Sequence, residues 1–493
     1  MILNRRQLGG SLFTAAIYLA GQLLARTDIW VALLFSAAIL SGLLAVFAGG
    51  GFGSALGTLN AILLAKFLLV AIGIKSLMLE PSDGPLRAAN TTAWVMAIGF
   101  FGLFLGTLIQ SHLYCPQSWS LNKPFSKQML LAFSIVLFVG SYAAYFVSMV
   151  PDTQGAGVQT GGYLGIARAL GSLKSLAIVP PMLYLWRSKT RLWMTHPVIL
   201  GLLAWAAVVG IFSTGKQDAM EPLGFYVITG FLRYGWRDLR LWSLVSLGLM
   251  YYTLIVFPYS QIVRYSGGRE GSFSERAAVT KEIFLRIVNN QDYRSTVEDH
   301  VSKETYFDPS LAAFSRLAMV GEADRLIYAT QQERAFTRWE TITWGFKLLT
   351  PSFLYPDKPI LGAGNYLAHI AGDLTSTDLT TGVSYGIMAN WYNAFSFTGV
   401  LIGTPIFFAA FYYWIRLFMG DARWEGLPTT SALWFIWLVA LYQHSIVEAP
   451  VSGIIATLSF PFVIAALCLA AKWLCLFLPQ EDQTVQFSLA NQY

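Results

Sequence analysis

The sequence has few charged residues. Only 12% of its 493 residues are Asp, Glu, Lys or Arg, whereas hydrophobic residues make up 55%. A soluble domain carries about 25% charged residues, so this chain lacks the polar surface needed to face water on all sides. Its mean hydropathy of +0.54 and its repeated long apolar runs indicate a polytopic membrane protein. The net charge of +6 is ordinary for such a protein and predicts no nucleic-acid partner.

The sequence also has few residues of the kinds that bind metals or form disulfides. Its three cysteines, Cys115, Cys468 and Cys475, have no metal-type spacing and offer no disulfide framework. No His-Glu-any-any-His motif and no Asp-any-Asp pair is present. We therefore predict no metal site and no cofactor. We also predict no serine nucleophile, on the interpretation that the sequence lacks a Gly-any-Ser-any-Gly elbow. Residues 213–218 superficially resemble a phosphate loop, but the first glycine and the preceding strand are missing, so nucleotide binding is rejected.

Apolar runs of membrane-spanning length recur along most of the chain. About 20 apolar residues are needed for one helical span, and boundaries read from sequence are good only to several residues. The segment 222–235 is short enough to be a re-entrant or tilted element. The predicted spans are 7–25, 29–47, 54–73, 91–112, 129–150, 165–186, 198–213, 222–235, 241–263, 393–417, 431–446 and 449–476.

The basic residues of the short connections predict the sidedness of these spans. With the N-terminus in the cytoplasm, Lys and Arg fall on the cytoplasmic side at almost every turn, as the positive-inside rule requires. The sequence thus predicts twelve spans in a bacterial inner (cytoplasmic) membrane, with both termini cytoplasmic. The basic residues in question are Lys123, Lys127, Arg187, Lys189, Arg191, Arg233, Arg237, Arg240, Arg416, Arg423 and Lys472.

One long connection is polar. Residues 265–392 hold 12 Lys or Arg and 15 of the 27 acidic residues, and long domains cross the membrane regardless of their charge. Apolar residues at helical spacing, such as Leu317 and Val320, predict helices there. The expected fold is an all-α polytopic membrane protein with one large, mainly helical periplasmic domain. Its parts are a bundle of about nine spans (1–264), the periplasmic domain (265–392), about three further spans (393–478) and a cytoplasmic tail (479–493).

Several arginines lie in or near this polar connection. A guanidinium binds phosphate oxygens through two parallel donors and keeps its charge, so these arginines are suited to a lipid-linked pyrophosphate. Alternatively, they extend to lipid headgroups or pair with nearby acids. Lys216 has the same two interpretations, as a contact for a lipid phosphate or sugar or as a lysine at the membrane edge. The arginines are Arg264, Arg269, Arg276, Arg316 and Arg325.

Candidate proton acceptors are fewer. His444 and Glu448 lie four residues apart at the predicted outer turn between the last two spans, where ionisable groups are costly and often functional. A helix-end packing pair is the equal alternative. Glu322 in the polar connection is a further candidate, and His369 shares helical spacing with Asp373.

Part of the polar connection resembles a known family. The segment 349–359, Leu-Thr-Pro-Ser-Phe-Leu-Tyr-Pro-Asp-Lys-Pro, followed by Gly364-Asn365, is similar to a signature of Wzy-type polysaccharide repeat-unit polymerases (O-antigen or exopolysaccharide polymerases). Residues 315–319 look like the arginine-containing helix of the same loop. The span count and loop position are also similar, whereas sequence likeness is confined to about 120 residues. Where many relatives have an acidic residue before the final spans, this chain has Asn390.

This resemblance implies an integral-membrane glycosyltransferase that uses undecaprenyl pyrophosphate as the carrier and needs no metal. It implies that the arginines neutralise the departing pyrophosphate, assisted by Lys216 and Lys358, with His369 near the glycan. The same resemblance leaves Glu322, His444 and Glu448 as candidates to accept the proton of the attacking hydroxyl. A structural role in folding the loop is the alternative for Lys358.

Two other functions remain open from the sequence. An O-antigen-ligase-type glycosyltransferase uses the same donor with another acceptor, and a transporter or flippase moves the lipid-linked oligosaccharide without forming a bond. The large polar connection argues against a transporter, in which charges line a path at mid-membrane. Expected partners are the undecaprenyl-pyrophosphate-linked oligosaccharide, membrane lipid, and a chain-length regulator and a flippase.

Overall fold

The structure is a computed structural model of the whole chain. Every described segment is helical or connects helices, and none of the described residues forms a strand. The all-α prediction is confirmed for this part of the chain. The described residues are 4–114, 125–148, 173–212, 216–235, 238–260, 317–334, 336–350, 363–374, 383–419 and 465–478, with isolated residues within 167–171 and 278–315.

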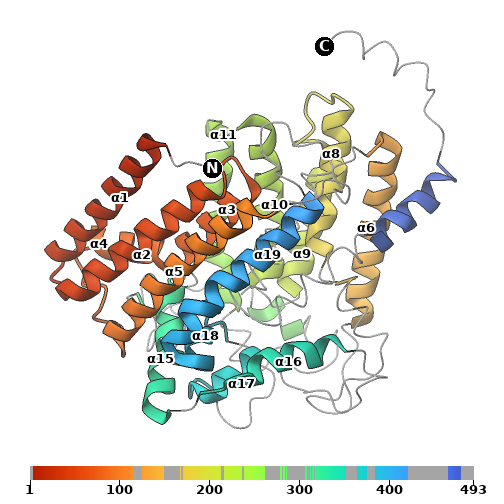
Figure 1. Cartoon of the computed structure of the whole chain (residues 1–493). Helices are drawn as coiled ribbons and strands as arrows, with labels where there is room; N and C mark the ends of the chain where they lie inside the picture. Colours follow the sequence, from red (N-terminus) through yellow and green to blue (C-terminus); the bar gives the residue numbers. More distant parts are fainter. Residues whose placement is uncertain are drawn as a thin grey trace.

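The N-terminal helices form one group, at the left of Figure 1. Helix α2 packs against α1, α3 and α5, so it lies at the centre of this group. Side chains of Asp28 and Ser54 cap the first turns of α2 and α3, which defines where these two helices begin. The helices are α1 (Arg5–Leu24), α2 (Ile29–Ala48), α3 (Ala55–Leu64), the π-helical η1 (Ala65–Leu69), α4 (Val70–Leu77) and α5 (Ala89–His112).

A second group follows in the chain and packs mainly within itself. Helix α10 contacts α9, η3 and α11, and α6 contacts η3 and α8. The elements are α6 (Lys127–Ser148), the 3-10 helix η3 (Lys174–Ile178), α8 (Val179–Arg187), α9 (Pro197–Phe212), α10 (Lys216–Tyr234), α11 (Leu239–Tyr251) and the π-helical η4 (Tyr252–Val256).

The third group contains the helices of the polar connection and the helix that follows it. Helices α15, α16 and α17 lie together at the lower edge of Figure 1, beside α18. Helix α15 contacts α5, α17 and α18, so the polar connection is attached to the N-terminal group. The elements are α15 (Met319–Glu333), α16 (Glu340–Leu349), α17 (Ala363–Ile370), α18 (Ile387–Thr398), the π-helical η7 (Gly399–Gly403) and α19 (Thr404–Met419).

Six helices within the described residues are long and apolar enough to cross a membrane. They agree with six of the predicted spans to within several residues, so the assignment of apolar transmembrane-type helices is confirmed there. The count of twelve spans and their sidedness stay predictions. The six are Ile29–Ala48, Ala55–Leu77, Ala89–His112, Lys127–Val147, Leu239–Ser260 and Ile387–Leu417.

The other predicted spans have varied outcomes. The first predicted span, 7–25, is the 20-residue helix α1, and the predicted span 198–213 corresponds to the shorter apolar helix α9. The segment 222–235 belongs to α10, which begins earlier, at Lys216, and contains Pro222. The predicted span 431–446 lies outside the described residues.

Glycines of α5 allow α19 to approach closely. A Cβ atom on Gly106 would stand 2.7 Å from the carbonyl oxygen of Pro405 and 2.9 Å from Cβ of Phe408. A Cβ on Gly102 would meet Thr404 and Pro405 at 3.0 Å. Small residues at such contacts bring helix backbones together, which is the usual way that helices associate in lipid.

The segment from α18 to α19 is broken near its start. Phe395 leaves the helical region, and Ser396 adopts φ 57° and ψ −152°, a conformation essentially restricted to glycine. The π-helical turn η7 follows three residues later. A non-glycine residue in this region costs of order 1–3 kcal/mol, so the surrounding structure must hold it there.

Candidate functional site

Asp324 on α15 caps α5, a helix more than 230 residues away in sequence. Its carboxylate accepts hydrogen bonds from the backbone N–H groups of Arg87 (2.6 Å) and Ala88 (3.0 Å) and from the hydroxyl of Thr92 (2.7 Å). The first N–H groups of a helix have no partner within it and carry partial positive charge. Asp324, 1% exposed, therefore fixes the polar connection to the beginning of α5.

Arg325, the next residue, turns to a different set of partners. Its guanidinium pairs with Glu322 one turn earlier and with Asp373 at 3.3 Å. The other carboxylate oxygen of Asp373 accepts a hydrogen bond from the Tyr385 hydroxyl. We call Glu322, Arg325, Asp373 and Tyr385 the α15 cluster; it joins α15, the turn after α17 and the segment just before α18.

Exposure in the α15 cluster rises from Asp373 to Glu322. The side chains of Asp373, Arg325 and Glu322 are 8%, 19% and 27% exposed, and Tyr385 is buried. Glu322 is therefore the carboxylate that an outside molecule reaches most easily. The cluster holds one cation against two anions, so Arg325 is already balanced by protein carboxylates.

Burial shifts the pKa values of two groups here. Burial raises the pKa of the Asp324 carboxyl, and the hydrogen bonds from Thr92, Arg87 and Ala88 act in the opposite direction. Burial and the negative charge of Asp373 raise the pKa of the Tyr385 phenol, and Arg325 opposes this shift. The Tyr385 phenol is therefore held neutral and donates its proton to the Asp373 carboxylate.

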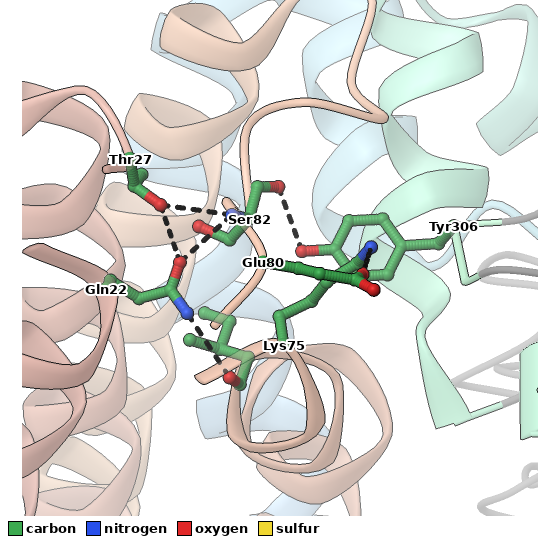
Figure 2. A network of polar contacts seen from close by, with 7 residues as sticks. Gln22, Thr27, Lys75, Glu80, Ser82 and Tyr306 are labelled. Carbon is green, nitrogen blue, oxygen red and sulfur yellow. Dashed lines mark hydrogen bonds and ion pairs between the residues drawn. The ribbon is translucent and has the colours of Figure 1, made fainter. Parts of the chain in front are cut away.

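A polar network joins the polar connection to the loops of the N-terminal helices, as Figure 2 shows. The Tyr306 hydroxyl donates to the carbonyl of Ser82 (2.9 Å), while the Ser82 N–H donates to the side chain of Gln22 (2.9 Å). Lys75 pairs with Glu80, and its ammonium lies 5.6 Å from the centre of the Tyr306 ring. Because the 26–28 and 78–88 loops both contact this network or Asp324, they meet the polar connection at one end of the bundle.

The break in α18 is held by the segment after α15. The N–H groups of Thr337 and Arg338 donate to the carbonyls of Asn393 and Ala394, each at 3.1 Å. The Asn393 side chain accepts from the Thr337 hydroxyl (2.7 Å) and donates to Thr330 of α15 (2.8 Å). Carbonyls left without a helical partner by the break are thus satisfied by neighbouring protein, as a low-dielectric surrounding requires.

The structure brings Glu322 and Arg325 together and places His369 at the end of α17. Lys216 is the first residue of α10, with its side chain outside the described set. The spacing of His369 and Asp373 does not form a helical pair, because α17 ends at Ile370 and Gly372 has φ +72°. The remaining predicted residues lie outside the described residues; they are Arg264, Arg269, Arg276, Arg316, Lys358, His444 and Glu448.

Sequence reasoning missed a buried ion pair in the second group of helices. Lys174 of η3 lies 2.7 Å from Asp218 of α10, with 7% of the lysine side chain exposed, and its ammonium lies 4.1 Å from the Tyr145 ring centre. The signal was available, since Lys174 lies inside the apolar segment 165–186. Its partner comes from another helix, however, and so it could not be predicted by spacing.

The prediction of no serine nucleophile overlooked one pattern. Residues 382–386 read Gly-Val-Ser-Tyr-Gly and match the Gly-any-Ser-any-Gly sequence of a nucleophile elbow. That elbow follows a β-strand, whereas the described residues just before Gly386 form no strand. Gly386 has φ +76° and serves as the N-cap of α18, so a turn at a helix start accounts for this glycine.

The chemistry available in the α15 cluster is acid–base and ionic. Glu322 can take up a proton, and Arg325 can bind an anion once a carboxylate partner is neutralised. No group of three or more His, Cys, Asp or Glu among the described residues is arranged to hold a metal ion.

No protein-family model, curated protein or solved structure matches this chain.

Proposed function

We propose that this protein is a membrane glycosyltransferase of the Wzy-type polysaccharide-polymerase kind. It transfers a growing glycan from undecaprenyl pyrophosphate to a lipid-linked repeat unit at the periplasmic face of the bacterial inner membrane. One observation supports this best: Asp324 fixes the helical polar connection to the beginning of α5, which leaves the Glu322–Arg325 pair partly exposed beside membrane-type helices. The resemblance of residues 349–365 supplies the substrate class.

The proposed reaction forms one glycosidic bond, breaks one and transfers one proton. A hydroxyl of the acceptor sugar forms a bond to the anomeric carbon of the donor glycan. The bond from that carbon to the pyrophosphate oxygen breaks, and the electron pair leaves with the pyrophosphate. Glu322 takes the hydroxyl proton, and Arg325 contacts the leaving phosphate.

The pairing of Glu322 with Arg325 links proton uptake to phosphate binding. Before proton uptake, Arg325 faces two carboxylates, so the α15 cluster repels a pyrophosphate. Protonation of Glu322 leaves Asp373 as the single anionic partner of Arg325. Proton uptake by the base thereby makes the guanidinium available to the leaving group at the same step. Arg264, Arg269, Arg276 and Arg316 supply further positive charge in this proposal, with Lys216 and Lys358.

A transporter or flippase is the second candidate, and one observation favours it. The buried Lys174–Asp218 pair lies between apolar helices, where ionisable groups often mark a transport path, and both η3 and the α18 break interrupt the helical segments. An O-antigen-ligase-type transferase shares the proposed chemistry and differs only in its acceptor.

The test is deletion of the gene, followed by analysis of lipid-linked glycans for chain length and membrane side. Single repeats on the outer leaflet with no polymer support a polymerase. Long lipid-linked chains that never reach their acceptor indicate a ligase, and repeats retained on the cytoplasmic leaflet indicate a flippase. Normal polymer contradicts all three.

Complementation with variants tests the role of the α15 cluster. Glu322→Gln keeps the shape of the side chain but cannot take up a proton, so polymer should be lost at normal protein level. Glu333→Gln is the matched control, since Glu333 is exposed at the last turn of the same helix. Full polymer with Glu322→Gln would remove Glu322 from the reaction.

A further inference from the structure

The described residues between α15 and α16, 334 and 336–339, have an unusual backbone; we call them the strap. Arg334 and Arg338 both adopt left-handed conformations with φ 50°, which non-glycine residues seldom do. The Phe336 N–H donates to the carbonyl of Arg334 at 3.1 Å, which closes a tight turn. Two such residues within five positions indicate that the surrounding contacts determine this shape.

The contacts that hold the strap come from the break in α18. The N–H groups of Thr337 and Arg338 bond to carbonyls freed at Asn393 and Ala394, and Thr337 is buried. Fixing Thr337 inward turns its neighbours outward: Phe336 is 39% exposed, Trp339 is 65% exposed, and Arg334 and Arg338 are also exposed. The strap therefore exposes two aromatic and two arginine side chains within six positions of the sequence.

This surface continues directly into an apolar one. After the break in the sequence, α18, η7 and α19 expose four apolar side chains at 38–63%: Phe397, Leu401, Ile402 and Ile406. From Phe397 to Leu417 the chain provides about 20 residues, roughly the 30 Å of a membrane's hydrocarbon core. The edge of Trp339 contacts Phe395 at the break, with ring centres 5.0 Å apart, so the strap lies where that apolar surface ends.

Two other exposed tryptophans lie at the same end of the bundle. Trp30 is 67% exposed in the first turn of α2, and Trp94 is 50% exposed near the start of α5. Both helices begin beside the loops that contact the polar connection. Tryptophans gather at the boundary between hydrocarbon and water because the ring is apolar and its N–H is polar.

We propose that the strap is a lipid-binding surface, with Phe336 and Trp339 inserted in the headgroup layer and Arg334 and Arg338 bound to anionic phospholipid. Exposed aromatic rings are stable at that depth, and guanidinium groups reach phosphate oxygens there. Anionic headgroups attract basic residues that lie near the membrane surface. This proposal is independent of the glycosyl transfer reaction.

The proposal explains why a strained strap persists. The strained backbone places the N–H groups of Thr337 and Arg338 on the two carbonyls of the α18 break, while Phe336 and Trp339 stay exposed where lipid can contact them. Binding the strap to the break secures the polar connection to a lipid-facing helix on one side, while Asp324 secures it to α5 on the other. The orientation of α15 relative to the membrane surface is thereby fixed.

Spin-label accessibility in lipid nanodiscs tests this depth. The full chain is prepared with Cys115→Ser, Cys468→Ala and Cys475→Ala, and a label is attached after Trp339→Cys or, separately, Phe336→Cys. Gln332→Cys is the matched control, because Gln332 is exposed on the last turn of α15. Labels at 336 and 339 should collide more with oxygen than with a water-soluble nickel complex, and a label at 332 should show the reverse. Nickel-dominated collisions at both 336 and 339 would overturn the proposal.

The choice of lipid tests the role of the arginines. Replacing phosphatidylcholine by phosphatidylglycerol should move the label at Phe336→Cys deeper, and Arg334→Gln with Arg338→Gln should abolish that shift. Arg334→Lys with Arg338→Lys should retain it, and this variant also reports on folding. An equal shift in the glutamine variant would overturn the assignment of anionic lipid as partner.

Discussion

Helix α5 and the segment from α18 to α19 pack side by side but satisfy their backbones in different ways. Helix α5 runs unbroken for 24 residues and receives charged partners at both ends. Asp324 binds the N–H groups at its start, and Arg416 donates to the carbonyls of Gln110 and Leu113 at its end, each at 3.2 Å. These charges oppose the helix dipole at each end. The α18 segment instead breaks in its interior and receives backbone donors from the strap.

The difference shows how the polar connection is held. Backbone groups in lipid must be bonded within the protein, so a break in an apolar helix persists only where another segment covers it. At α5 the polar connection supplies a side chain to a helix end, whereas at α18 it supplies main-chain donors to a helix break. Both attachments come from α15 or the residues directly after it, and Glu322 and Arg325 of the α15 cluster flank Asp324 in the sequence.

The largest effect is expected from removing the hydrogen-bond acceptors at the start of α5. Asp324→Ala leaves two N–H groups and the Thr92 hydroxyl without their acceptor in a buried place, where each unsatisfied group costs about 1–3 kcal/mol. We expect a loss of stability of at least about 3 kcal/mol, measured as a fall in unfolding temperature in detergent. Asp324→Asn keeps one oxygen acceptor and should fall between Asp324→Ala and wild type. Equal stability of the two variants would contradict this account of the cap.

The next effect concerns the contact between α5 and α19. Gly106→Leu places side-chain atoms where the Pro405 carbonyl and Phe408 now stand, and overpacking of this kind costs typically 1–3 kcal/mol. Gly140→Leu on α6 is the control, because a Cβ there meets nothing within 4 Å. Thermal unfolding should separate the two variants, with only Gly106→Leu destabilised. Similar unfolding temperatures would show that the two helices are not in such close contact.

A smaller effect, with an unusual sign, is expected at the break. In a regular helix alanine is more stable than glycine by about 1 kcal/mol. At Ser396 the order should be reversed, with Ser396→Gly more stable than Ser396→Ala by about 1 kcal/mol, because only glycine adopts that conformation without strain. Unfolding of the pair in detergent measures the difference directly. The ordinary order, alanine above glycine, would mean that α18 continues through Ser396.

The smallest effect is the pH dependence of the Asp324 cap. Burial raises the pKa of this carboxyl in the folded protein, so its contribution to stability is complete below the ordinary aspartate pKa of about 3.9 and is lost as pH rises through the raised pKa. Wild type should therefore lose unfolding temperature relative to Asp324→Asn as pH rises from about 4 to 7. A trend in the other direction would mean that the three hydrogen bonds outweigh burial.

The apolar helices could be predicted from sequence because their signal is local. Runs such as 29–47 and 91–112 need only composition and length, and the structure has helices at those positions. The contacts that attach the polar connection to α5 and α18 could not be predicted, because their partners are distant in the sequence. Asp324 and Arg325 are adjacent in the sequence, yet adjacent residues of a helix face different directions, and Asp324 binds α5 while Arg325 binds Glu322 and Asp373.

The break at Ser396 and the turn after α17 show the same limit. Phe395 and Ser396 are ordinary helix residues, so nothing local predicts a strained conformation; the strap imposes it from a distance. His369 and Asp373 have helical spacing, but Gly372 ends the helix between them and releases Asp373 toward Arg325 and Tyr385. The spacing of two residues predicts that they share a helix face only where the helix is continuous between them.

The most direct test of the proposed function is polymerisation by the purified protein. The full chain in nanodiscs would be incubated with undecaprenyl-pyrophosphate-linked repeat units from its own host, without metal or nucleotide sugar, and product length measured by mass spectrometry. The account predicts glycans of two or more repeats with release of undecaprenyl pyrophosphate, and none with Glu322→Gln. Single repeats that remain unchanged with folded wild-type protein would contradict it.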